Sequence, residues 1–483
     1  MENFILIAYV LALTVLFGFG MHGLYMLYYF HKTAHINHKA DELTDNFPVV
    51  TVQLPMFNEM YVVERLIRAV CEINYPIDKL EIQVLDDSTD ETVELSKKLT
   101  EEFKAKGYDI KHIQRVDRTG YKAGALKEGM STARGEFIAI FDADFVPNED
   151  FLMKTIPHFA DEGIGCVQTR WEHLNEDYSM LTRAQALALD GHFVIEQQIR
   201  NKAGFFINFN GTAGVWRKTT IEDAGNWQAD TLTEDLDLSY RAQLNGWKFI
   251  FLPDVSSPAE LPADINALKT QQFRWTKGAI ETAKKILPRV LKSNLSLKLK
   301  MECTVHLTSN IVFPFIIVVA LMNIPIVLIK NQIGGLDGYY TLLSIFVLAS
   351  ASTFLFYMYA QRAIHLDWRR RILLFPIFLG GSMGFAVNNT KAVLEALFNI
   401  KTGFARTPKY KIETGKDKWQ KKKYVGRKIG GTVYFELFMT LYFIVGIGIS
   451  AYYMEIAAIP FQLLFLWGFG AVGFMSLKHA LSK

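Results

Sequence analysis

Long apolar stretches stand at both ends of the chain and frame a more polar middle. Residues 4–30 contain no Asp, Glu, Lys or Arg, and the run exceeds the roughly 20 residues that a helix needs to cross a bilayer. A cleaved signal peptide is the alternative, but the start Met-Glu-Asn is not basic and the run is too long. Further apolar runs cover residues 304–329, 339–364, 432–453 and 456–477. The pattern predicts a transmembrane helix within residues 1–32 and about four spans in a C-terminal membrane region, residues 301–483.

The run of residues 372–400 is also apolar, but glycine, Asn, Lys and Glu residues interrupt it. The loop that follows, residues 401–431, holds eleven Lys and Arg residues against two acidic ones, and residues 369–371 are Arg-Arg-Arg. The positive-inside rule therefore predicts that both flanks are cytoplasmic. We expect residues 372–400 to lie in the interface as an amphipathic helix or to re-enter the membrane. Five spans then leave the N-terminus outside and the C-terminus inside, as in a multi-pass protein of the cell or inner membrane with a cytoplasmic middle domain.

Residues 45–300 alternate between short β-branched or apolar runs and amphipathic helical stretches. The predicted strands are residues 49–56, 80–87, 110–116 and 137–144, and helical periodicity covers residues 58–74 and 90–107. Such alternation is typical of a mostly parallel α/β sheet. The sequence therefore predicts an α/β domain inserted between transmembrane helices.

Charge and cysteine content narrow the classes further. A net charge of +3 over 483 residues gives no footprint for nucleic acid, so no nucleic-acid partner is expected. The basic loop, residues 401–431, is expected near the anionic headgroups of a lipid bilayer or near an anionic substrate. Cys71, Cys166 and Cys303 are scattered without metal-ligand spacing, which supports neither a disulfide framework nor a zinc site. The sequence assigns no accessory subunit.

Two predicted strands end in acidic pairs, Asp86 with Asp87 and Asp142 with Asp144. Ligands of open α/β sheets bind beyond the carboxyl ends of the strands, so both pairs are expected in one crevice. Asp142 and Asp144, spaced by one residue, can hold Mg²⁺ or Mn²⁺, whose shell phosphates and water complete. Asp86 and Asp87 can accept the imino N–H of uracil or of guanine. A surface turn is the structural alternative for Asp142 and Asp144. A turn that caps the next helix is the alternative for Asp86 and Asp87.

Two further groups suit a phosphate-bearing ligand. Arg118 and Lys122 flank a glycine turn at a predicted helix start, where ordinary surface charge is the alternative. Gln271, Arg274 and Trp275 have the spacing i, i+3, i+4 and share one face of a helix. An amide, a guanidinium and an indole together can hydrogen-bond, pair with phosphate and stack on a sugar. An interfacial anchor beside the membrane is the alternative for this trio.

The stretch of residues 231–248 crowds Glu234, Asp235 and Asp237 into the start of a predicted helix. Thr231 and Glu234 have the spacing of a capping box, and acids in a first turn favourably meet the positive end of the helix dipole. These residues alone leave helix capping and catalysis both open.

The motifs follow one another in the order Asp86-Asp87, Asp142-Ala-Asp144, Thr233-Glu-Asp235 and Gln271-Gln-Phe-Arg274-Trp275. This order resembles the D, DxD, TED, QxxRW signature of the processive membrane β-glycosyltransferases of glycosyltransferase family 2, which include cellulose, hyaluronan and chitin synthases. The chain is most similar to the cellulose-synthase-like A and C subfamilies, through residues 120–130, 141–145, 167–171, 209–217, 234–252 and 260–275. The resemblance covers residues 48–290 densely and implies a nucleotide-sugar transferase domain of the GT-A type.

The resemblance also implies roles for the matching residues. Asp86 and Asp87 would bind the nucleotide base, Asp142 and Asp144 the metal and diphosphate, and Asp235 would be the general base. The remaining donor-binding residues are Pro55, Glu59, Arg118, Lys122, Gln271 and Arg274, and the acceptor-binding residues are Gly211, Thr212, Glu234 and Trp275. The loop 401–431 resembles a gating loop with the motif F-x-V-T-x-K through Phe404, Thr407 and Lys409, with Arg406 in place of Val.

The implied activity is inverting, metal-dependent transfer of hexose from GDP-mannose or UDP-glucose. The product would be a β-1,4-linked mannan, glucomannan or glucan, translocated across the membrane as it grows. Asp235 would take the proton of the acceptor hydroxyl; Glu234 and Asp237 would raise its pKa, and the helix N-terminus would oppose them. The alternative enzyme is a non-processive glucosyltransferase with a lipid acceptor, but the number of spans and the gating-like loop favour polymer extrusion. A transporter or scaffold with a degenerate transferase domain is disfavoured because all four motifs are intact.

Overall fold

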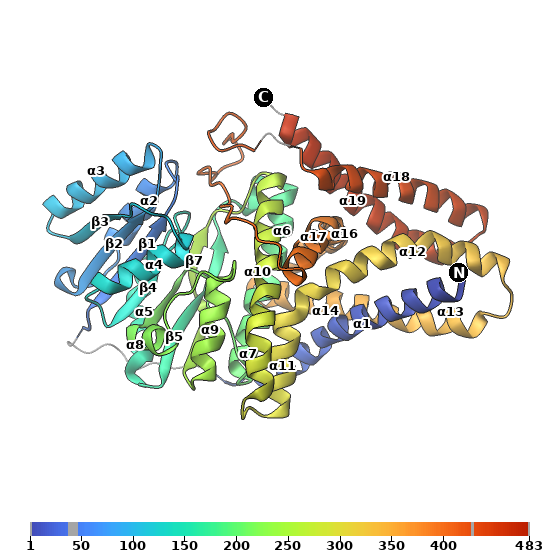
Figure 1. Cartoon of the computed structure of the whole chain (residues 1–483), viewed down its shortest axis with the longest axis horizontal. Coiled ribbons are helices and arrows are strands. Elements are labelled where there is room, and N and C mark those ends of the chain that lie inside the picture. The colour runs from blue at the N-terminus through green and yellow to red at the C-terminus, as the bar shows by residue number, and fades with distance from the viewer. Residues whose placement is uncertain (1, 37–46, 427–428, 482–483) are drawn as a thin grey trace.

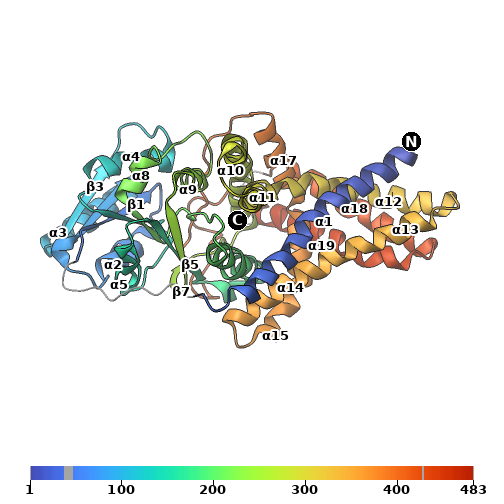
Figure 2. The same cartoon turned by 90° about the horizontal axis from the view of Figure 1, so that it is seen from below.

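The structure is a computed structural model that describes residues 2–36, 47–426 and 429–481. An α/β domain and a bundle of long helices lie side by side (Figure 1). The domain follows the first long helix in the chain and precedes the others, as the sequence predicts. A view at right angles also separates the sheet from the long helices (Figure 2).

Seven strands form one sheet. Their bounds are β1 Val50–Met56, β2 Leu80–Asp86, β3 Asp109–Gln114, β4 Phe137–Ile140, β5 Ile164–His173, β6 Gly214–Arg217 and β7 Lys248–Ala259. Their order is β3-β2-β1-β4-β6-β5-β7, and β6 runs antiparallel to both of its neighbours while the other pairs are parallel. The expected mostly parallel sheet is therefore present. The predicted strand 137–144 is shorter than expected: β4 ends at Ile140, because Phe141 onward turns into the loop that carries Asp142 and Asp144.

The central strands are buried on both faces, but the faces differ in chemistry. Val50, Val52 and Leu54 of β1 alternate onto a fully apolar face. The intervening Thr51 and Gln53 are also buried, and each hydrogen-bonds a side chain of β2: Thr51 Oγ1 to Glu81 at 2.6 Å and Gln53 Nε2 to Gln83 at 3.0 Å. Since side chains alternate with a period of two, β1 places side chains in the buried layers on both faces of the sheet. Pairing satisfies the buried polar groups.

Helices cover both faces of the sheet and connect it to the bundle. Their bounds are α2 Val63–Cys71, α3 Thr92–Ala105, α4 Tyr121–Thr132, α5 Phe151–Thr155, α6 Met180–Asp190, α7 Gln198–Lys202, α8 Lys218–Asp223, α9 Glu234–Leu244 and α10 Ile265–Lys292. The longest of these, α10, stands at the junction between the sheet and the bundle in both views (Figures 1 and 2).

The bundle contains the apolar stretches. Its helices are α1 Glu2–Lys32, α11 Leu297–Thr308, α12 Val312–Gln332, α13 Asp337–Leu343, α14 Val347–Ile364, α15 Trp368–Arg371, α16 Phe375–Gly384, α17 Ala386–Leu397, α18 Gly431–Tyr452 and α19 Ile459–Leu481. Within the described residues, five helical segments are long and apolar enough to cross a membrane: Glu2–Lys32, Leu297–Gln332, Asp337–Ile364, Gly431–Tyr452 and Ile456–Leu481. The chain is thus a multi-pass membrane protein.

The ambiguous run of residues 372–400 forms two helices bent by 43° at Phe385. The first, α16, lies against α19 at a glycine contact, where a Cβ on Gly384 would come within 2.2 Å of the Gly468 carbonyl. The second, α17, packs on α10, the helix at the junction with the α/β domain. The bend connects the bundle to the α/β domain, and the position of this pair relative to the bilayer stays a prediction.

Candidate active site

A cleft opens beyond the carboxyl ends of β1, β2 and β4, as expected for an open α/β sheet. Its wall is completed by the start of α9, one face of α10 and the loop after α17. Of the residues that the sequence selects, the cleft is lined by Pro55, Glu59, Asp87, Arg118, Lys122, Asp142, Asp144, Gly211, Glu234, Asp235, Gln271, Arg274, Trp275, Phe404, Thr407 and Lys409. Segments more than 350 residues apart in sequence thus meet at one place.

Each carboxylate of the Asp142-Ala-Asp144 motif is in contact with a lysine. Asp142 Oδ1 lies 2.6 Å from the ammonium of Lys122, and Asp144 Oδ2 lies 2.5 Å from that of Lys409. Cations therefore fit beside both carboxylates, and hard oxygen ligands are those that Mg²⁺ and Mn²⁺ prefer. Among the described residues, no group of three or more His, Cys, Asp or Glu side chains could hold a metal ion. A bound metal would accordingly need oxygen atoms from a ligand, such as phosphates, in addition to this pair.

The two acids at the end of β2 point in different directions. Asp86 is fully buried, accepts the Ser88 N–H at 2.9 Å and lies 3.0 Å from His112 Nε2. Contrary to expectation, it does not line the cleft. Only Asp87 faces the cleft. Arg115, which the sequence analysis missed, binds the Asp87 carboxylate through both Nε, at 2.9 Å, and Nη2. The alternation of side chains at the strand end separates these neighbours.

Arg115 also organises the turn before α4. Its guanidinium donates to the main-chain carbonyls of Thr119 and Tyr121, each at 3.0 Å. Arg118 from this turn lies with its guanidinium carbon 3.3 Å from the centroid of the Phe57 ring. A guanidinium held against an aromatic face at a cleft can still donate in its own plane. The sequence offered a weak signal for Arg115, since it lies near the end of the predicted strand 110–116.

Asp235 lies at the start of α9 beside the backbone of Gly211. Burial and the negative charge of Glu234 together raise the pKa of Asp235 to about 7, although Lys122 opposes both. Asp237, which was expected to raise this pKa as well, is not among its main causes. It is fully buried and forms ion pairs with Arg241 at 2.8 Å and Lys285 at 3.0 Å. A carboxyl group with a pKa near neutrality is suited to general base catalysis.

The expected capping box of Thr231 and Glu234 does not form. Thr233 precedes the first helical residue and makes no capping hydrogen bond, and Thr231 Oγ1 is buried without a partner among the described residues. Instead, the Leu232 N–H donates to Glu281 of α10 at 3.0 Å, and Thr233 Oγ1 lies 3.1 Å from Thr282 Oγ1. Packing against α10 therefore replaces the local cap, which spacing in the sequence cannot reveal.

The finger-like turn of residues 209–213 contributes backbone rather than side chains. Gly211 lines the cleft and its carbonyl accepts from Lys122 at 2.8 Å. Thr212 is fully buried and does not line the cleft, so it does not meet the expectation of an acceptor contact. Its Oγ1 accepts the N–H of Asp142 at 2.9 Å and fixes the backbone of the Asp142-Ala-Asp144 motif.

The loop after α17 reaches over the cleft. Phe404 stacks on Tyr121 with ring centroids 5.6 Å apart, and the Arg274 guanidinium lies 4.6 Å from the Phe404 centroid. Arg406, the departure from the family motif, pairs with Glu59 at 3.1 Å. Burial raises the pKa of Glu59 to about 8, although Arg406 lowers it. The loop thus contributes cations and an aromatic ring to the cleft.

Several polar atoms buried around this cleft have no hydrogen-bond partner among the described residues. They are Glu59 Oε2, Arg118 Nε, Trp171 Nε1, Glu260 Oε2, Arg274 Nε and Thr407 Oγ1. Nearly all buried polar groups of folded proteins are hydrogen-bonded. Their concentration here indicates a polar ligand. Glu260, Trp171 and His173 also line the cleft and were not selected as site residues from the sequence. Trp171 and Glu260 lie within segments that carry the resemblance, whereas His173 does not.

Comparison with known proteins defines the class. Residues 48–278 match the family described as Glycosyltransferase like family 2. A solved mannosyltransferase from Pyrobaculum calidifontis, in complex with GDP-Man and Mn2+, is similar with a TM-score of 0.58, at 18% identity over 82% of this chain and 100% of that one. Residues 48–278 are therefore similar to family 2 glycosyltransferase domains, and the fold is of the GT-A type.

The more similar relatives are plant enzymes. Glucomannan 4-beta-mannosyltransferase 1 of Oryza sativa subsp. japonica is 45% identical over 52% of this chain and 49% of its own length. Glucomannan 4-beta-mannosyltransferase 2 of Arabidopsis thaliana is 44% identical over 53% of this chain and 49% of its own length. The expected resemblance to the cellulose-synthase-like A group is confirmed. The chain spans about half the length of these curated relatives.

Proposed function

We propose that the protein polymerises mannose from GDP-mannose into a β-1,4-linked mannan or glucomannan. The observation that carries this proposal is the position of Asp235, whose pKa is raised to about 7. It shares one cleft with Asp87 and the Asp142-Ala-Asp144 motif. The similarity to plant glucomannan mannosyltransferases supports the choice of sugar.

Transfer proceeds in a single displacement at the anomeric carbon. Asp235 accepts the proton of the acceptor hydroxyl while the new bond from that oxygen to the anomeric carbon forms. The bond between this carbon and the diphosphate oxygen breaks at the same time, and the nucleoside diphosphate leaves. Attack opposite to an α-linked leaving group produces a β-linkage. Proximity of the groups and removal of the proton each lower the barrier.

Cationic side chains of the cleft bind the diphosphate of the donor. Lys122 and Arg274 line the cleft near Asp142 and Asp235 and stabilise the charge that develops on the leaving group. A Mg²⁺ or Mn²⁺ ion held by Asp142 and Asp144 would supply further charge neutralisation there. Asp87, oriented by Arg115, accepts the imino N–H of the base. Trp275 provides the face on which the acceptor sugar stacks.

The helical bundle directly adjoins this cleft, which supports transfer of the growing polymer into the membrane. Residues Gln271, Arg274 and Trp275 line the cleft from α10, which also packs on α11, α17 and α19. The basic loop after α17 supports a cytoplasmic position of the catalytic domain, where nucleotide sugars are made available. The protein then extrudes its product through the spans while Phe404, Thr407 and Lys409 gate the cleft.

A comparison of the two sugar donors, with the protein in membranes or nanodiscs, tests the proposal. Purified protein receives labelled GDP-mannose or UDP-glucose with Mg²⁺ or Mn²⁺, and any polymer is digested with a β-mannanase or a β-glucanase. Label from GDP-mannose in a product that only β-mannanase degrades is the expected result. A glucanase-sensitive product from UDP-glucose would overturn the choice of sugar. Label confined to a lipid-extractable product of single transfer would overturn polymerisation.

A further inference from the structure

Arg65, on α2 at the edge of the cleft, joins three parts of the protein that are distant in sequence. Its Nη2 donates to the main-chain carbonyl of Asp144 at 3.1 Å, and its Nη1 binds the Glu413 carboxylate of the basic loop at 2.7 Å. The same Nη2 lies 3.9 Å from Glu260 Oε2 at the end of β7. The Arg65 side chain is only 12% exposed, so these contacts are largely shielded from solvent.

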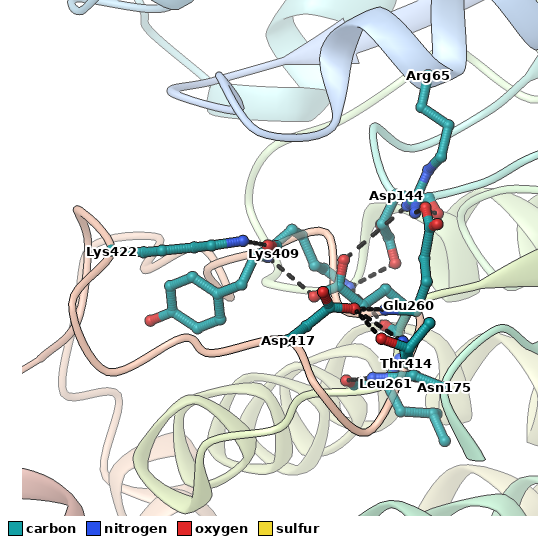
Figure 3. A network of polar contacts seen from close by, with 11 residues as sticks. Arg65, Asp144, Asn175, Glu260, Leu261, Lys409, Thr414, Asp417 and Lys422 are labelled. Atoms are coloured by element: carbon teal, nitrogen blue, oxygen red, sulfur yellow. Dashed lines mark hydrogen bonds and ion pairs between the residues drawn. The ribbon is translucent and has the colours of Figure 1, made fainter. Parts of the chain in front are cut away.

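The loop is held at this place by a compact network (Figure 3). The Tyr410 N–H donates to Glu260 Oε1 at 2.9 Å, and Lys409 binds Asp144. Beyond these contacts, Asp417 Oδ2 accepts the N–H groups of Glu413 and Thr414 at 2.9 and 2.8 Å. That turn presents the Glu413 carboxylate to Arg65. Loop docking and the metal motif therefore share one guanidinium.

The geometry favours a coupling function over simple surface pairing. Glu413 is 45% exposed, so its pair with Arg65 alone would contribute little to stability. The bond to the Asp144 carbonyl is different, because it restrains the backbone of the residue whose carboxylate the metal motif requires. Arginine can make both contacts at once through its fork of donors, whereas lysine is a single point charge. Arg65 can thus transmit the state of the loop to Asp144.

We propose that Arg65 is a positioning residue that couples docking of residues 409–417 to the placement of Asp144 for transfer. This inference rests on the proposed function for its effect on turnover. Docking of the loop on Arg65 is independent of the reaction. When the loop is docked, Arg65 is anchored at both ends and Asp144 is held. When the loop leaves, the guanidinium loses one anchor and the restraint on Asp144 weakens.

The test compares Arg65→Ala and Arg65→Lys with Arg68→Ala in the full chain in nanodiscs. Arg68 lies one helical turn further along α2 and pairs with Glu64 at 3.0 Å and Glu102 at 3.2 Å, outside the cleft. We expect Arg65→Ala to lower kcat by about 10- to 100-fold, the range typical of residues that orient metal ligands. Binding of GDP without divalent cation should change less than about twofold, because the base contacts are untouched. The kcat of Arg65→Lys should lie between those of Arg65→Ala and the wild type, and the kcat of Arg68→Ala should match the wild type.

Hydrogen–deuterium exchange of residues 409–417 provides the readout that does not need turnover. Arg65→Ala and Glu413→Gln should both accelerate exchange there, because each removes one of the contacts that hold the docked loop. The double variant should lose no more kcat than Arg65→Ala alone, since coupled residues are not additive. Additive losses, or a loss of turnover without faster exchange, would overturn the coupling. If the wild type transfers no sugar, the proposed function fails, while unchanged exchange in Arg65→Ala would separately overturn the docking role.

Discussion

A methyl group added to Gly211 would lie 2.9 Å from Oδ2 of Asp235. Gly211 also has φ +79°, in the left-handed region where residues with a side chain are strained. The turn before β6 therefore leaves no room for a side chain between its backbone and the proposed base. The acceptor hydroxyl must reach Asp235 through the space that this glycine leaves open.

Gly211→Ala should abolish transfer with only a modest loss of stability. The methyl group displaces the Asp235 carboxylate, and the left-handed backbone costs about 1–2 kcal/mol. Gly204→Ala is the matched control, because Gly204 has φ +73° and no atom within 4 Å of an added Cβ. Both variants should unfold at similarly lowered temperatures, but only Gly211→Ala should lose sugar transfer. Equal turnover in the two variants would contradict the close contact with Asp235.

Asp235→Asn should preserve nucleotide binding and remove turnover. The amide has nearly the same shape but cannot accept a proton, and general base catalysis contributes about 10²- to 10⁴-fold. Transfer of labelled sugar and binding of GDP by calorimetry check the two halves separately. Appreciable transfer by the variant would disprove the role of Asp235.

On the acid limb of its pH profile, kcat/KM should rise as the pH increases through about 7. The base must be ionised, and burial together with Glu234 raises the pKa of Asp235 to about 7. Glu234→Gln removes the repulsion, so the pKa of Asp235 falls and the acid limb should move to lower pH. An acid limb that stays in place in Glu234→Gln would show that another group is being titrated.

The stability of the protein should decrease as pH rises from 4.5 to about 8, in part because of Glu59. Burial raises the pKa of Glu59 from 4.5 to about 8, so the folded state holds a proton that the unfolded state releases in this window. Unfolding then becomes more favourable as pH rises. Glu59→Gln cannot ionise and should flatten this part of the curve. Thermal unfolding of both proteins across the window measures the difference, and parallel curves would rule Glu59 out.

Arg115→Lys should weaken nucleotide binding although it keeps the positive charge. Lysine cannot bind the Asp87 carboxylate through two parallel donors or hold the carbonyls of Thr119 and Tyr121 at the same time. We expect the affinity for GDP to fall about 10-fold, as for the loss of a charge-assisted hydrogen bond. Arg134→Lys is the control, because Arg134 pairs with Asp109 on β3 and is half exposed. Similar affinities for the two variants would contradict the role of Arg115.

Much of the site could be predicted because its residues occupy positions with local meaning. Asp87, Asp142 and Asp144 follow apolar strands, and Gln271 and Arg274 share a face of one helix, so short-range periodicity was enough to select them. Asp86 and Asp237 carry the same side chain in similar contexts, yet both are buried in ion pairs or hydrogen bonds. Arg241 lies on the same helix as Asp237 at the spacing i+4, but His112 and Lys285 come from elsewhere in the fold, and spacing does not identify them.

The sequence by itself determined the α/β domain between apolar helices and the order of the four motifs, because hydrophobic periodicity and chain order are local properties. Only the tertiary structure decided that Arg115 orients Asp87, that α10 rather than Thr231 supports the start of α9, and that Arg65 joins Glu413 to Asp144. Each of these contacts joins segments that are remote along the chain. Such pairs form only when packing brings both segments to one place, and no local pattern records that geometry.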